Sequence, residues 1–281
     1  MTAVTPDIAR SAPAGPAKSA EPAAPARFAE VLLSEWTKLR TVRSTYATAL
    51  LAALGAVAVA VMGCARYVQQ YPTLSADDRA TDLTNFSLTG VYLAQIALGA
   101  LGVLVISGEY GTGMIRATLT AVPQRRRVLA AKGLVLTAAT AALGEALSFA
   151  AFGVGQAILS TRHVGASLGD PGVLRAVAGA GLYLAATALL GFGLGALIRH
   201  SAGALSAFFG LLYGSTALID VLPTSWRNAV INYMPANAGS QVMAVQHTPG
   251  ALGAWTGLGV FACYAAAAII AATVLITRRD A

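Results

Sequence analysis

The chain has 281 residues, of which 56% are hydrophobic and only 11% are charged. Because soluble globular domains carry about 25% charged residues, this composition excludes an ordinary water-soluble domain. The formal net charge of +7 would suggest a nucleic-acid partner in a soluble protein. Here the basic residues flank apolar runs, so we expect them to set membrane orientation, and we expect no nucleic acid among the partners.

Residues 1–27 are rich in Ala and Pro and contain no apolar core. This composition predicts a disordered cytoplasmic tail and not a cleavable signal peptide. The remaining residues, 28–281, are expected to form one transmembrane domain. The fold class that follows is all-α: a polytopic six-helix membrane bundle with an N-terminal interfacial amphipathic helix.

Residues 28–42 predict that interfacial helix, because their apolar residues recur at helical spacing. We expect it to lie in the inner membrane surface with its basic residues facing anionic headgroups; the alternative is a basic flank that only sets topology. Its apolar face comprises Phe28, Val31, Leu32, Trp36, Leu39 and Val42. Its polar side comprises Glu30, Ser34, Glu35, Lys38 and Arg40. The residues expected to hold it at the membrane are Phe28, Leu32, Trp36, Lys38 and Arg40.

A membrane-spanning helix needs about 20 mostly apolar residues. The stretches that qualify are Thr45–Cys64, Leu88–Ser107, Val128–Leu159, Leu174–Ile198, Ser201–Leu222 and Ala254–Thr277. Cytoplasmic loops collect Lys and Arg, and the richer set of alternate segments includes both chain ends. We therefore expect a multi-pass protein of the cell membrane with both termini cytoplasmic. The longest outer segment, 221–251, is expected to form either short helices at the outer interface or a simple surface loop.

The segment 108–127 lies between the second and third expected spans. Gly108, Gly111 and Gly113 are expected to break the second span, and Thr112 is expected to cap a short helix that Pro123 ends. The apolar side of this helix would be suited to a groove on a partner protein. That side comprises Met114, Ile115, Leu119 and Val122.

Glu109 lies at the base of the second span, within expected reach of Arg116 and the cluster 125–127. An ion pair there would lock the loop to the bundle, so that motion of the loop would move the spans. The alternative is a solvated turn whose arginines serve topology alone. The candidate coupling and docking residues are Glu109, Tyr110, Met114, Ile115, Arg116, Leu119, Arg125, Arg126 and Arg127.

Glu145 is the acidic residue deepest in an expected span. Charged groups at that depth usually face the bundle interior or a water-filled cavity, so Glu145 is a candidate for a substrate path, a proton relay or a structural pair. Small residues also recur at helix-packing spacing. These pairs are Gly191 with Gly195, Ser206 with Gly210 and Gly214, and Gly253 with Gly257.

The sequence contains no phosphate-binding loop and no zinc-protease motif. Cys64 and Cys263 fall in apolar runs and belong to no metal-binding pattern. We therefore expect no catalytic residue, no metal site and no cofactor bound by this chain.

The chain resembles the membrane subunit of ABC-2 type transporters in three segments. They are Ser34–Thr45 before the first span, Glu109–Leu119 with the basic residues 125–132, and Met234–Gly239 before the last span. The resemblance implies six spans, an interfacial helix and a coupling helix at 108–127 that sits on a separate ATPase. It also implies a second permease copy or paralogue, ATP and Mg on the ATPase, and export of a hydrophobic or amphipathic substrate. By position, Glu109 and Arg116 match the charged pair of that family.

Two other functions remain open from the residues. One is an ion-driven secondary transporter in which Glu145 titrates. The other is a membrane scaffold or sensor with no transport path.

Overall fold

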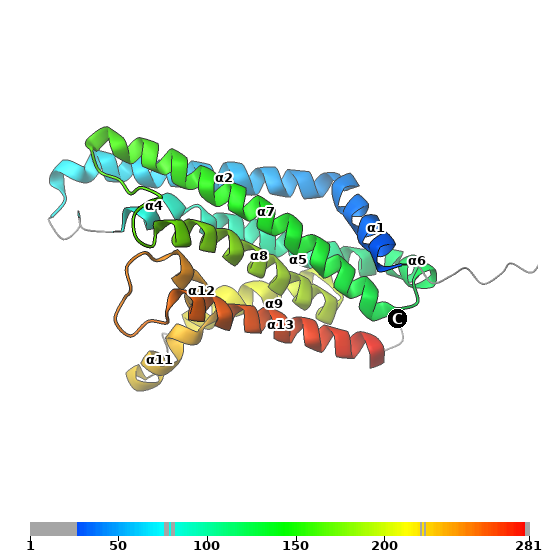
Figure 1. The fold of residues 1–281 in the computed structure, drawn as a ribbon. Coiled ribbons are helices and arrows are strands. Elements are labelled where there is room, and N and C mark those ends of the chain that lie inside the picture. The colour runs from blue at the N-terminus through cyan, green and yellow to red at the C-terminus, as the bar shows by residue number, and fades with distance from the viewer. Residues whose placement is uncertain (1–26, 76–78, 80–81, 220, 222, 279–281) are drawn as a thin grey trace, which may run out of the picture.

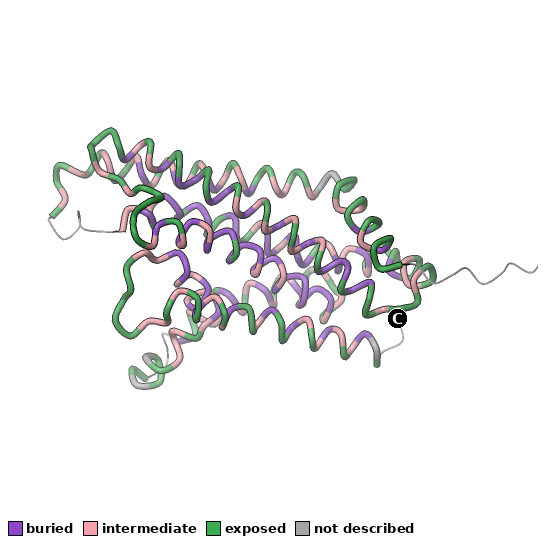
Figure 2. Tube along the Cα trace, in the orientation of Figure 1, coloured by how far each residue is buried: buried purple, intermediate pink, exposed green. Residues whose placement is uncertain are grey.

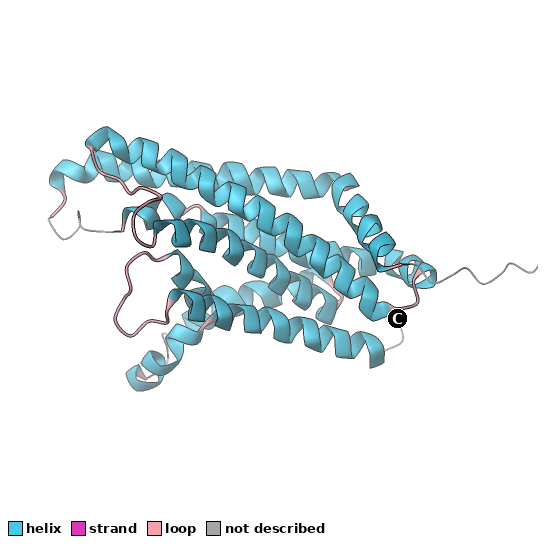
Figure 3. Cartoon of the chain, viewed as in Figure 1, coloured by secondary structure: helices cyan, strands magenta, loops and turns pink. Residues whose placement is uncertain are grey.

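The computed structural model describes residues 27–278 apart from 76–78, 80–81, 220 and 222. The tail expected at 1–27 therefore lies outside the described residues, except for Arg27. Within the described ranges every regular element is helical (Figure 3). Six helical segments there are long and apolar enough to cross a membrane. The all-α fold with six candidate spans is thus confirmed.

The helices begin and end close to the expected positions. In chain order they are α1 Phe28–Thr41, α2 Arg43–Gln70, α4 Leu83–Leu88, α5 Val91–Gly111, α6 Met114–Ala121, α7 Arg125–Leu159, α8 Val173–Ile198, α9 Ser201–Phe209, α10 Ser215–Ile219, α11 Thr224–Val230, α12 Pro235–Ser240 and α13 Ala254–Arg278. Between α9 and α10 the fifth span passes through a π-helical turn, Gly210–Gly214.

Helices α5 and α8 form the centre of the bundle, as the buried tube in Figure 2 shows. In the most apolar stretch of α8, 67% of residues are buried, against 22% in α2 and in α13. The outer helices thus expose apolar side chains such as Leu51 and Ile270. An apolar outer surface of this kind is the one that lipid tails would cover.

Glycines bring α5 and α8 into close contact. A Cβ added to Gly102 would lie 2.0 Å from the carbonyl oxygen of Ala188, and one added to Gly191 would lie 2.2 Å from that of Gly99. The packing role predicted for Gly191 and Gly195 is confirmed. Gly210 and Gly214 make no such contact within the bundle, because nothing lies within 4 Å of either added Cβ, and a contact with a second copy of the chain there stays a prediction.

The two ends of the bundle carry different additions (Figure 1). Helices α1 and α6 lie at one end, and α11 and α12 lie at the other. Residues 221–251 contain the short helices α11 and α12, as the first of the two expectations has it, and their position at the outer interface stays a prediction. Trp226 on α11 exposes 68% of its surface.

The expected start of the third span is wrong by about one helical turn. Helix α7 begins at Arg125 and not at Val128. The basic cluster 125–127 is therefore the first turn of a long helix. Its side chains radiate from a rigid element, which fixes their positions better than a solvated loop would.

Candidate functional site

A two-residue turn joins α5 to α6. Helix α5 continues through Gly108 to Gly111, and the Thr112 hydroxyl donates a hydrogen bond back to the Gly108 carbonyl oxygen (2.9 Å). Gly113 then adopts the left-handed conformation with φ of 72°, which favours glycine. The expectation that Thr112 caps the short helix is wrong, since Thr112 ends α5 and Gly113 precedes α6.

The predicted docking residues of α6 are partly buried and partly exposed. Ile115 is buried and packs in a cluster with Leu129 and Leu136, and Leu119 lies at the edge of that cluster. Met114 and Arg116 are exposed. The apolar side of α6 therefore attaches the helix to the bundle, and a narrower outer face remains exposed.

Four charged side chains form a network beneath α6, and we call it the ion network: Glu35, Lys38, Glu109 and Lys132. The Lys132 ammonium donates to Glu35 and, over 2.8 Å, to Glu109. The Lys38 ammonium lies 2.7 Å from Glu35 and 3.6 Å from Glu109. Two lysines and two glutamates alternate, so each charge has two opposite charges as neighbours.

Burial makes the ion network structurally important. Glu35, Glu109 and Lys132 are all buried, with 3%, 7% and 3% of their surfaces exposed. Removing a charged group from water costs several kcal/mol, and only close opposite charges offset that cost. The network therefore holds α1, α5 and α7 in one arrangement at this end of the bundle.

Lys38 extends the ion network to α6. Its ammonium lies 3.3 Å from the Thr118 hydroxyl, which is on α6. Burial lowers the pKa of Lys38, but the hydrogen bond to Glu35 and the attraction of Glu109 outweigh that effect and leave the pKa above its ordinary value. Lys38 is therefore a cation at neutral pH, and a charged residue of α1 contacts the exposed helix directly.

The partners of Glu109 differ from those that we expected. Among the described residues, Glu109 pairs with Lys132 and Lys38 and not with Arg116 or the cluster 125–127. The placement of Glu35 and Lys38 on a solvent or headgroup side of α1 is also wrong, because α1 folds against α7 and turns Val31 and Glu35 inward.

The other residues expected to hold α1 at the membrane lie outward. Phe28 and Trp36 expose 39% and 41% of their surfaces, and Arg40 lies over the Trp36 ring at 5.8 Å. Leu32 is half-buried. An exposed tryptophan beside an arginine suits a membrane surface, so this part of the expected interfacial face stays a prediction.

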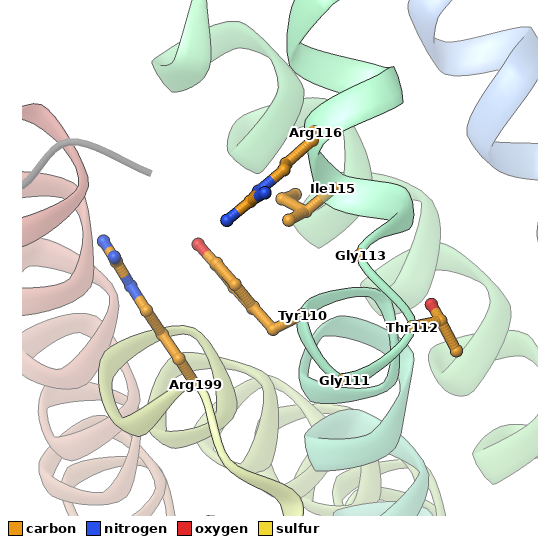
Figure 4. Close-up of a pocket in the computed structure, with 7 residues that line it drawn as sticks. All are labelled: Tyr110, Gly111, Thr112, Gly113, Ile115, Arg116 and Arg199. Carbon is orange, nitrogen blue, oxygen red and sulfur yellow. The ribbon is translucent and has the colours of Figure 1, made fainter.

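The arginines of the basic cluster 125–127 also differ in their environments. Arg125 donates to the Ile276 carbonyl oxygen of α13 (3.0 Å), whereas Arg126 and Arg127 are exposed. The Arg199 guanidinium lies 5.2 Å from the ring centre of Tyr110 (Figure 4).

A pocket of about 560 Å³ opens beside the ion network. Its apolar walls come mainly from α5 and α7, among them Leu101, Leu104 and Val135, and α2 contributes Thr45 and Thr48. The four charged side chains close one end of it. Such a pocket would accommodate a molecule with an apolar body and one polar end.

Glu145 lies midway along α7, half-buried, with its carboxyl group against α8. A Cβ added to Gly181 would lie 2.5 Å from the Glu145 carboxyl carbon, so no larger residue fits there. Glu145 forms no ion pair with any residue that the structure describes.

A second polar group inside the bundle was not expected from the sequence. The Tyr183 hydroxyl donates to Gln95 (2.6 Å), and the Gln95 amide donates to the Tyr213 hydroxyl (3.0 Å). Gln95 is buried, and Tyr213 belongs to the π-helical turn. The signal that could have found this group is a glutamine inside an apolar run, because such a residue needs a partner within the membrane.

No family model matches this chain, and no curated protein does. The six long apolar helices show a polytopic helical membrane protein. The resemblance to ABC-2 type permeases rests on the sequence segments themselves.

Proposed function

We propose that this chain is the membrane-spanning subunit of an ATP-driven exporter of the ABC-2 type, powered by a separate ATPase that docks on α6. The observation that carries the proposal is the ion network. It connects α6, through Lys38 and Thr118, to α1, α5 and α7. A force applied to α6 would reach two spans and the N-terminal helix without passing through a mobile loop.

The exposed face of α6 supports the docking role. Met114 is exposed on a helix whose opposite side is fixed by buried Ile115, and Arg116, also exposed, lies beside it at the edge of the Tyr110 pocket. A helix with one apolar and one basic residue exposed suits a groove with acidic rims on a partner protein. The same end of the bundle carries Arg126 and Arg127, which agrees with the cytoplasmic orientation that the basic residues predict.

The pocket beside the ion network supports a hydrophobic or amphipathic substrate. Its apolar walls would hold a hydrocarbon part, and its charged end would hold a polar group. Because Glu35, Lys38, Glu109 and Lys132 form both the coupling connection and this end of the pocket, substrate contact and partner motion would act on the same groups.

The experiment that tests the proposal has two steps. The tagged protein is first purified in mild detergent from its native membrane, and the bound proteins are identified by mass spectrometry. We expect a stoichiometric ATPase that is lost in a Met114→Glu, Arg116→Glu variant. Export and ATP hydrolysis are then measured for Glu109→Gln, which we expect to stay in the membrane and bind the ATPase but lose export.

Glu30→Gln is the matched control for Glu109→Gln, because Glu30 is an exposed carboxylate of α1 outside the ion network. Wild-type export by Glu109→Gln would contradict the coupling role. A preparation without any ATPase would favour a scaffold or an ion-driven transporter. Transport that persists without ATP and stops in Glu145→Gln would favour the ion-driven transporter.

The orientation is tested separately by replacing Cys64 and Cys263 with Ala and adding one cysteine at Arg126 or at Thr161. We expect a membrane-impermeant thiol reagent to label the cysteine at 161 in intact cells. The cysteine at 126 should react only after the membrane is opened.

A further inference from the structure

The turn between α8 and α9 places an arginine at the end of two spans. Arg199 follows the last residue of α8, and α9 begins two residues later at Ser201. Arg199 has φ of 61°, a left-handed conformation that favours glycine at the end of a helix, and its N–H bonds to the Gly195 carbonyl oxygen. The backbone of Arg199 is thus fixed at the point where α8 ends and α9 is about to begin.

A pocket of about 370 Å³ lies between this turn, the end of α5 and the start of α6 (Figure 4). In Figure 4 the Arg116 guanidinium and the Tyr110 hydroxyl point toward each other, and the Arg199 side chain runs alongside the Tyr110 ring. Ile115 supplies an apolar wall. Three hydrogen-bond donors therefore converge on one space from three different elements.

These donors have unused capacity. The Tyr110 hydroxyl and one Arg199 Nη are buried without a hydrogen-bond partner among the described residues. Neither Arg116 nor Arg199 forms an ion pair with any residue in the described ranges. Buried polar groups in folded proteins are nearly always paired, so the unpaired donors point to a ligand.

The charge around the pocket defines the sign of that ligand. Arg199 and Arg125 both lie near enough to act electrostatically on Tyr110, and Glu109 acts on it with the opposite sign. The neighbouring carboxylate, Glu109, is directed to Lys38 and Lys132. Arg116 and Arg199 both line the pocket, and an anion bound there would offset the repulsion between their positive charges.

We propose that this pocket binds the phosphate group of an anionic phospholipid. Arginine guanidinium groups match phosphate oxygens in charge and in geometry, and a phenol hydroxyl adds one further donor. Basic pockets between spans on the cytoplasmic side are suited to lipid headgroups. Ile198, immediately before Arg199, exposes an apolar side chain on which an acyl chain can lie.

The depth of the pocket favours a lipid over a soluble anion. Arg199 and Tyr110 both lie within one or two residues of the ends of candidate spans. That is the level at which lipid phosphates lie in a bilayer. The lipid site does not require the transport function, because it rests on this pocket alone.

Binding is tested with the purified full-length chain in a neutral detergent. The thermal unfolding midpoint and the bound lipid, counted by native mass spectrometry, are measured against added phosphatidylglycerol or phosphatidylcholine. We expect phosphatidylglycerol alone to raise the midpoint and to remain bound. Each lost charge-assisted hydrogen bond should weaken apparent affinity about tenfold in Arg116→Gln and in Arg199→Asn.

The variants separate the pocket from general surface charge. Asparagine tolerates the left-handed conformation, so Arg199→Asn removes the guanidinium and keeps the turn. Arg126→Gln removes an exposed arginine at the same end and should respond like the wild type. Tyr110→Phe should keep the lipid-free midpoint while weakening the lipid response, since the hydroxyl has no hydrogen-bond partner in the part of the chain that the structure describes.

Three results would overturn the proposal. One is an equal lipid-induced shift of the unfolding midpoint in Arg116→Gln, Arg199→Asn and Arg126→Gln. That result would mean that lipid binding depends only on the overall charge of the protein. Another is an equal effect of phosphatidylcholine. The last is the same midpoint shift with inorganic phosphate, which would assign the pocket to a free anion.

Discussion

Lys132 of α7 lies 2.8 Å from a carboxylate oxygen of Glu109, the last acidic residue of α5. The same ammonium also donates to Glu35, 97 residues earlier in the chain. One buried cation therefore joins the N-terminal helix to two spans directly below α6.

Lys132→Met should destabilise the protein strongly. It leaves Glu35 and Glu109 buried with Lys38 as their remaining cation, and Lys38 is partly exposed. Removing one partner of a buried ion pair costs on the order of 3–5 kcal/mol of unfolding free energy. Arg127→Met, on an exposed position of the same helix, should change it by less than about 0.5 kcal/mol. Thermal unfolding in detergent measures both, and similar midpoints for the two variants would show that the ion network does not stabilise the fold.

Adding Glu35→Leu to Lys132→Met should restore part of that stability. The double variant removes one charge of each sign and leaves Glu109 with Lys38, so no carboxylate is buried without a cation. Coupling energies between residues in one ion network are commonly about 0.5–3 kcal/mol. The four unfolding midpoints of the double-mutant cycle measure this coupling. Strictly additive midpoints would mean that Glu35 and Lys132 do not stabilise each other.

The contribution of Lys38 should be lost only at high pH. Its pKa lies above the ordinary 10.5, because the hydrogen bond to Glu35 and the attraction of Glu109 outweigh burial. A group whose pKa is raised in the folded state stabilises it fully below the unfolded pKa, and that stabilisation disappears as the pH rises through the folded pKa. The stability difference between wild type and Lys38→Met should therefore be constant from about pH 7 to about pH 9 and shrink above the unfolded pKa.

Lys38→Arg provides the control for that titration. Arginine stays charged throughout this pH range, so the Lys38→Arg variant should keep its stability where the wild type loses this contribution. A difference between wild type and Lys38→Met that already changes near neutral pH would assign the effect to another group.

The six spans could be predicted because each depends on a local property, the length of an apolar run. The short helix α6 followed in the same way from Gly113 and Pro123. The partners of Glu109 could not be predicted, because they depend on how α1 folds back onto α7. Arg116 lies seven residues from Glu109 and was the expected partner, whereas Lys132 reaches it only because α5 and α7 are neighbours in the bundle.

The position of Glu35 in the sequence indicated that it could be buried, although the helical pattern assigned it to the polar side. It lies one turn from Val31, and the two form the buried side of α1, yet an acidic residue is ordinarily assigned to the polar face. Lys132 gave a similar signal, since it lies one turn inside the third span. An acidic residue on an apolar stripe and a basic residue inside a span are candidates to pair, and the bundle brings these two together.

Replacing glycines with alanine tests whether α5 and α8 are in close contact at the centre of the bundle. Gly102→Ala adds one methyl group that would lie 2.0 Å from the Ala188 carbonyl oxygen, so the helices must separate. Overpacking of this kind costs about 1–3 kcal/mol or more. Gly153→Ala on α7 is the matched control, because nothing lies within 4 Å of its added Cβ, and replacing a helical glycine there should stabilise the protein by about 0.4–1 kcal/mol. Unfolding midpoints should therefore move in opposite directions for the same chemical change, and a parallel shift would mean that α5 and α8 do not meet at Gly102.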